Sequence, residues 1–104
     1  MNTEAARRYE VQIKRLACLY QTGERYQKIK ADINAVLMHL SAEIGSDARD
    51  RVSAWSDLHN ALKRSLIISA DPHWIKVIRF ALSRVKSYKQ NALVSHSGSR
   101  ALQA

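Results

Sequence analysis

A chain of 104 residues can bury one modest hydrophobic core and is too short for two. Three glycines and one proline give it too few turn residues for a strand-rich fold, so its 46% hydrophobic content predicts an all-α domain. The net charge of +8 favours an acidic partner, the apolar runs fall far short of the roughly 18 residues of a membrane span, and the single cysteine excludes an internal disulfide.

The first helix is predicted at residues 4–22. Thr3 is a good N-cap, because a hydroxyl can accept a hydrogen bond from the exposed N–H groups of a first turn. The inward side recurs every three or four residues and comprises Tyr9, Ile13, Leu16 and Tyr20. This stripe changes face at Gly23, so we expect a tight turn at 22–24 rather than one long helix.

The second helix is predicted at residues 25–44 and should stop at Gly45. Its inward seam comprises Tyr26, Ile29, Ile33, Val36 and Leu40. A second stripe of small residues and one methionine lies opposite this seam and comprises Ala31, Ala35, Met38 and Ala42. A helix that is apolar on two sides is central or interfacial, so this stripe favours a homodimer seam. The alternative is that alanine is frequent here only because it stabilises helices.

The third helix is predicted at residues 47–68, with Ser46 or Asp47 as its cap. Its inward stripe comprises Val52, Trp55, His59, Leu62 and Leu66, and Leu58 flanks it. Gly45 lies between two helices as in a helix-turn-helix motif, but the position that should be a buried aliphatic residue is Arg51. The aspartates of this helix would also repel phosphates, so we do not assign that motif.

The fourth helix is predicted at residues 72–92. Asp71 is its expected N-cap, and Pro72 suits the first helical position, where a missing N–H has no cost. Its inward stripe comprises Trp74, Ile78, Ala81, Leu82, Val85 and Tyr88. We therefore expect residues 1–93 to form a single antiparallel bundle of about four helices, and residues 94–104 to form a flexible tail.

The positive charge is concentrated near the C-terminus, because residues 72–104 hold six basic residues and no acidic one. On a helical wheel, most of these cations share the outer side with an aromatic ring. Cations can bind an acidic partner and the ring can stack or anchor it. The predicted partner-binding residues are Lys76, Arg79, Phe80, Ser83, Arg84, Lys86 and Lys89. The alternative is a solvated outer face, with Phe80 covered by the first helix or by the tail.

The first helix carries further cations on its outer side, namely Arg7, Arg8, Lys14 and Arg15. In an up-and-down bundle the first and fourth helices are neighbours. We therefore expect the two basic surfaces to merge into one patch.

No pattern of catalytic residues is present. The four histidines lack metal-ligand spacing, no glycine-rich phosphate loop occurs, and Cys18 has no base at helical spacing. His59 falls on an inward stripe and is predicted to be a hydrogen-bonded core residue. We therefore expect neither an enzyme, nor a metal or other cofactor, nor a small-molecule substrate.

Two functions remain. The first is a cytoplasmic regulatory protein that binds nucleic acid, or a nucleic-acid-associated complex, through the Lys/Arg face of the last helix. The second is an adaptor, inhibitor or chaperone-like bundle, dimeric through the alanine stripe, that recognises an acidic groove on a protein. A basic amphipathic membrane binder is a weaker third reading, because the apolar side of the last helix is needed to close the bundle.

Overall fold

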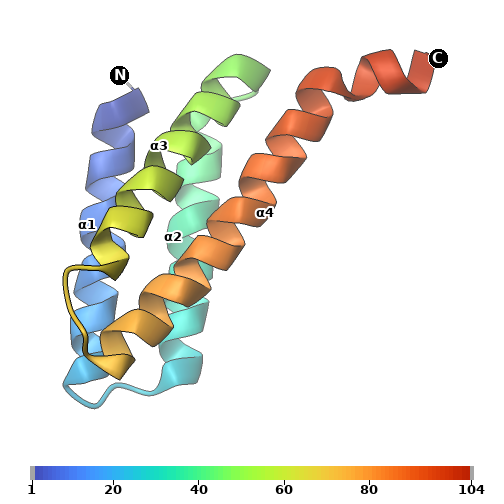
Figure 1. The fold of residues 1–104 in the computed structure, drawn as a ribbon. Coiled ribbons are helices and arrows are strands. Elements are labelled where there is room, and N and C mark those ends of the chain that lie inside the picture. The colour runs from blue at the N-terminus through green and yellow to red at the C-terminus, as the bar shows by residue number, and fades with distance from the viewer. Residues whose placement is uncertain (1, 104) are drawn as a thin grey trace.

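The computed structural model describes the backbone of residues 2–103 and the side chains of residues 4–94, and this part of the chain contains four helices and no strand. Successive helices run in opposite directions, which makes an antiparallel bundle (Figure 1). The predicted all-α fold is therefore confirmed. The helices are α1 (Asn2–Gln21), α2 (Tyr26–Ile44), α3 (Ala48–Leu66) and α4 (Pro72–Gln103).

Glycines end the first two helices. Gly23 and Gly45 have φ angles of +111° and +85°, a left-handed region in which a Cβ is strained. Arg51 donates from Nη1 to the carbonyl oxygens of Gly45, at 2.6 Å, and Ser41, at 3.1 Å. A cation on the last carbonyls of α2 also suits the negative end of the helix dipole. Arg51 therefore has a structural role at the position where a helix-turn-helix motif needs an aliphatic residue.

Two of the predicted N-caps are confirmed. The side chain of Asp47 accepts a hydrogen bond from Asp50 N at 3.0 Å at the start of α3. At the start of α4, Asp71 Oδ1 accepts from His73 N at 2.8 Å. The start of α1 differs from the prediction, because the helix already includes Thr3, the residue expected to cap it. The side chain of Thr3 lies outside the described side chains.

The predicted end of the fourth helix was too early. The helical backbone of α4 continues past residue 92 to Gln103. This segment contains no proline, and a single glycine lowers helix stability by about 1 kcal/mol without stopping a helix. Side chains from residue 95 onward lie outside the described ones, so the flexible tail expected at 94–104 stays a prediction.

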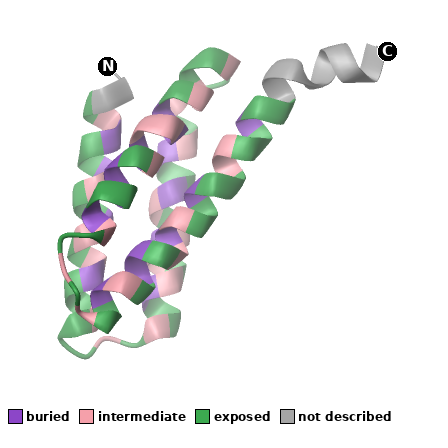
Figure 2. Ribbon diagram, in the orientation of Figure 1, coloured by how far each residue is buried: buried purple, intermediate pink, exposed green. Residues whose placement is uncertain are grey.

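The core lies where the inward sides of all four helices meet (Figure 2). α1 contacts each of the other helices, which its buried Ala6 and Ala17 permit because small side chains let helices approach closely. Eleven larger side chains of the core have no exposed surface, and they are Ile13, Ile29, Ile33, Leu37, Leu40, Trp55, Leu58, Leu62, Val77, Ile78 and Val85. Leu37 and Val77 were missing from the predicted stripes.

The buried side of α3 also differs from its predicted stripe. His59 is only partly buried, while Ala54, Ala61 and Ser65 are buried. The small residues face inward because α3 packs against both α1 and α4, and a hydropathy pattern gives them little weight. The hydroxyl of Ser65 lies 3.0 Å from both Ala61 O and Glu10 Oε2, so this buried polar group is satisfied.

Candidate nucleic-acid interface

Five cations of α4 have no acidic partner among the described side chains. Lys76, Arg79, Arg84 and Lys86 are exposed and Lys89 is half-buried. Within the described side chains, none of these five lies within ion-pairing distance of a carboxylate. Cations that lack an internal partner remain available for an external anion.

A first groove runs beside the start of α4 and has a volume of about 550 Å³. Most of its lining is apolar, and two cations stand at its rim. It is lined by Tyr26, Ala70, Pro72, Ile75, Lys76, Arg79 and Phe80, and we call it the aromatic groove. An apolar floor with cations at the rim suits a flat, apolar group that carries negative charge at its edge.

A second groove follows on the other side of Phe80, between α2 and α4, with a volume of about 440 Å³. Its lining is richer in amides and cations. It is lined by Gln27, Lys30, Ala31, Asn34, Phe80 and Arg84, and we call it the amide groove. Arg84 Nε donates to Asn34 Oδ1 at 3.1 Å, which holds the guanidinium over this groove. The Phe80 ring therefore separates two adjoining grooves.

Cations and rings from three helices meet around these grooves. Lys76 Nζ lies 4.2 Å from the ring centroid of Tyr26 and 5.8 Å from that of Tyr20. Lys30 Nζ lies 5.1 Å from the ring of Tyr26 and 5.9 Å from that of Phe80. Each exposed cation–π contact is worth about 0.5–1 kcal/mol. The contacts therefore orient these side chains but are weak enough for a ligand to replace them. We call these five residues the aromatic–basic cluster.

Phe80 is half-buried, and its ring packs edge-on against Tyr26 of α2 with centroids 6.4 Å apart. It is thus covered in part by α2, whereas the sequence suggested the first helix or the tail as the alternative to exposure. Lys30 and Tyr26 were missed as site residues. The charge of residues 23–45 sums to zero, which hides the position of Lys30, and Tyr26 was assigned to the core seam alone.

Another side of α4 faces α3, and here the positive charges of Lys86 and Lys89 act on His59. Burial is the main cause that lowers the pKa of His59, and the positive charges of Lys89, Lys63 and Lys86 lower it further. His59 is half-buried rather than a core residue. The cations of α4 therefore point along two sides, one toward the aromatic–basic cluster and one toward α3. Ser83 lies between them, exposed, with its hydroxyl donating to Phe80 O at 2.8 Å.

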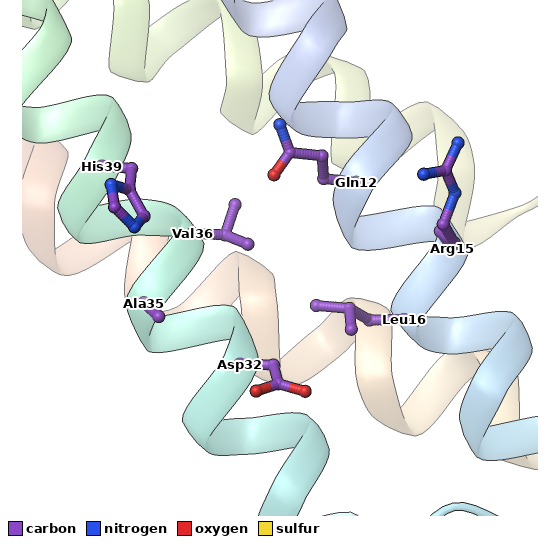
Figure 3. Close-up of a pocket in the computed structure, with 7 residues that line it drawn as sticks. All are labelled: Gln12, Arg15, Leu16, Asp32, Ala35, Val36 and His39. Atoms are coloured by element: carbon purple, nitrogen blue, oxygen red, sulfur yellow. The ribbon is translucent and has the colours of Figure 1, made fainter.

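The cations of α1 lie elsewhere, although α1 and α4 are in contact as expected. Lys14 is 3.9 Å from Glu10. Arg7 lines a groove between α1 and α3 that also contains acidic side chains. Arg15 lines a groove between α1 and α2, opposite Asp32 and His39 (Figure 3). Arg8 forms an ion pair with Glu43 of α2, and none of the four α1 cations lines the aromatic or the amide groove.

The alanine stripe of α2 faces outward. All four of its residues are exposed, and Met38 has 65% of its surface accessible; the residues are Ala31, Ala35, Met38 and Ala42. A dimer seam requires an exposed stripe. Alanines on the outer side of a monomeric bundle are exposed in the same way. The homodimer therefore stays a prediction.

Comparison of the chain with protein-family models, with curated protein sequences and with solved structures returned no match. Across the described residues, no helix is both long and apolar enough to cross a membrane. The same residues contain no group of three or more histidine, cysteine or acidic side chains that could hold a metal ion. A functional assignment therefore depends on the geometry and charge of the surfaces described above.

Proposed function

We propose that this chain is a non-catalytic regulatory protein that binds nucleic acid, or a nucleic-acid-associated complex, through the outer side of α4. The observation that carries the proposal is that five cations of α4 have no carboxylate partner among the described side chains, and that three of them, Lys76, Arg79 and Arg84, line the grooves beside partly exposed rings. Lys86 and Lys89 extend the positive charge toward α3. Phosphates can supply the negative charge that pairs with these cations, and nucleotide bases can stack their flat faces on the aromatic rings.

The spacing of the cations supports a polyanion over a single acidic group. From Lys76 to Lys89 the helix advances about 20 Å at about 1.5 Å per residue. The cations also point along two sides of α4. A phosphodiester chain carries charges repeated along its length, so it can engage all of them at once, whereas one acidic side chain meets one or two.

The test is fluorescence anisotropy with labelled DNA and RNA of mixed sequence. The variant removes three charges, with Lys76, Arg79 and Lys86 changed to alanine. A matched control removes three charges from positions away from α4, namely Lys28, Arg49 and Arg64. We expect the first variant to lose affinity at least tenfold and the control to lose much less. Equal losses in both, or no binding by the wild-type protein at low salt, would overturn the proposal.

A protein partner is the second candidate, and the apolar floor of the aromatic groove is the observation that favours it. A peptide with one hydrophobic side chain flanked by acids could place that side chain in the aromatic groove, against Tyr26 and Phe80. In this case the chain acts as an adaptor, an inhibitor or a chaperone-like bundle. Affinity capture after nuclease treatment separates the two functions. Recovery of one stoichiometric acidic protein supports this candidate, and recovery only with intact nucleic acid counts against it.

A further inference from the structure

The two grooves on either side of Phe80 have the form of two neighbouring nucleotide sites. We propose that they bind unpaired bases, so that the preferred ligand is single-stranded nucleic acid. This inference rests on the proposed function and adds a selectivity to it. The geometry that carries it is the pair of adjoining grooves, one apolar and one lined with amides, divided by a single half-buried ring.

The aromatic groove can contact the flat face of a base. Tyr26 and Phe80 line it from α2 and α4, and their rings are inclined at 74° to each other. The ring of Tyr26 is open enough for the ammonium group of Lys76 to lie 4.2 Å from its centroid. A base that stacks on the Tyr26 ring replaces the cation–π contact of Lys76 with a stacking contact. The displaced ammonium group then lies beside the base and can contact the adjacent phosphate.

The amide groove can contact the edge of the next base. The amides of Gln27 and Asn34 offer both donors and acceptors, which match the polar edge of a base. Arg84 is held by its Nε on Asn34, and in the described part of the chain its two Nη groups make no hydrogen bond. A guanidinium oriented in this way can bind a phosphate with two parallel hydrogen bonds.

A double helix does not fit this arrangement. In a duplex the faces of the bases are stacked on each other and their pairing edges are used, so neither groove gains a base. A duplex could still contact the exposed cations of α4, because phosphate contacts do not require free bases. The structure therefore predicts that base contacts, not phosphate contacts, distinguish single strands from duplexes.

The experiment uses the full chain and three probes with equal phosphate numbers per strand. These are a single-stranded 12-mer of mixed sequence, the same strand in a duplex, and a 12-mer of abasic sites. We expect the single strand to bind at least tenfold more tightly than the abasic strand. Similar affinity for the single-stranded and abasic probes would overturn the inference and leave the proposed function intact. Failure to bind any probe at low salt would overturn both.

Substitution of Phe80 gives a second readout. Phe80→Leu keeps an apolar side chain against Tyr26 but removes the ring, and Phe80→Tyr keeps the ring. We expect Phe80→Leu to lose about tenfold in affinity for the single strand and nothing for the abasic strand, with Phe80→Tyr close to wild type. Equal losses on both probes would contradict base stacking. Should Phe80→Leu fail to fold, the comparison of probes on the wild-type protein still decides.

Discussion

Replacing either buried tryptophan with phenylalanine is the same chemical change, yet Trp55→Phe and Trp74→Phe should differ in their effect on the free energy of unfolding. Trp74 donates from Nε1 to Ser65 O at 2.8 Å. Trp55 is fully buried and stacks on Tyr88 with ring centroids 4.5 Å apart, but its Nε1 has no hydrogen-bond partner among the described residues. Comparison of the two sites therefore separates the contribution of the indole N–H to stability from that of the buried indole surface.

The magnitudes follow from these contacts. Each substitution removes about two CH₂-sized groups of buried surface, which costs about 1–2 kcal/mol. Trp74→Phe also loses one hydrogen bond worth about 1 kcal/mol. The carbonyl of Ser65 keeps its bond from Ile68 N at 3.2 Å, so it is not left unpaired. Trp55→Phe instead removes a donor that is buried without a partner, which recovers about 1–3 kcal/mol.

We therefore expect Trp55→Phe to be close to neutral and Trp74→Phe to destabilise the protein by about 2–3 kcal/mol. Urea unfolding followed by far-ultraviolet circular dichroism measures both values. The two variants should have the wild-type m-value, which checks that the unfolded states are comparable. Equal destabilisation by both substitutions, or a larger loss for Trp55→Phe, would refute the reasoning.

Three further predictions test other parts of the structure. Arg51→Met should lower the free energy of unfolding by about 1–3 kcal/mol because it uncaps α2, while Arg49→Met should change it by less than about 0.5 kcal/mol; similar urea midpoints for the two variants would argue against the cap. Because the pKa of His59 is lowered in the folded protein, the contribution of this residue to stability is present above the unfolded pKa of 6.5 and is lost as the pH falls through the folded pKa. An NMR titration should give a pKa for His59 below 6.5, and addition of a polyanion should raise this pKa. A pKa at or above 6.5 in the free protein would contradict the burial of the His59 ring. The dimer predicted from the alanine stripe should give a dimeric mass for the wild-type protein in light scattering and a monomeric mass for Met38→Glu. A monomeric wild-type protein would exclude the dimer, and an unchanged dimer in the variant would exclude the alanine stripe as its seam.

The sequence predicted the fold through two kinds of local signal. Helical periodicity identified four amphipathic helices, and the chemistry of Gly45, Asp47 and Asp71 located three of their ends. Ser65, Ala54 and Ala61 were missed as buried residues because a hydropathy pattern gives little weight to polar and small side chains. Their burial depends on how closely α1 approaches α3, which is a tertiary property.

The candidate site was predicted only in part. The concentration of cations on α4 follows from a segment that contains no acid, which a sequence displays directly. The contributions of Lys30 and Tyr26 do not, because they depend on which side of α2 meets α4. The sequence also could not show whether the cations of α1 and α4 form one basic patch, because this too depends on how the helices pack. In the structure Arg7 and Arg15 each line a groove to which α4 contributes no residue.

The most direct test of the nucleic-acid surface is the salt dependence of single-strand binding, measured for the wild-type protein and for the variant that lacks Lys76, Arg79 and Lys86. With about four phosphate contacts, the logarithm of the association constant should fall against the logarithm of salt concentration with a slope near −3, and the variant should give a slope near −1. A wild-type slope near zero, or the same slope in both proteins, would contradict the assignment of this surface.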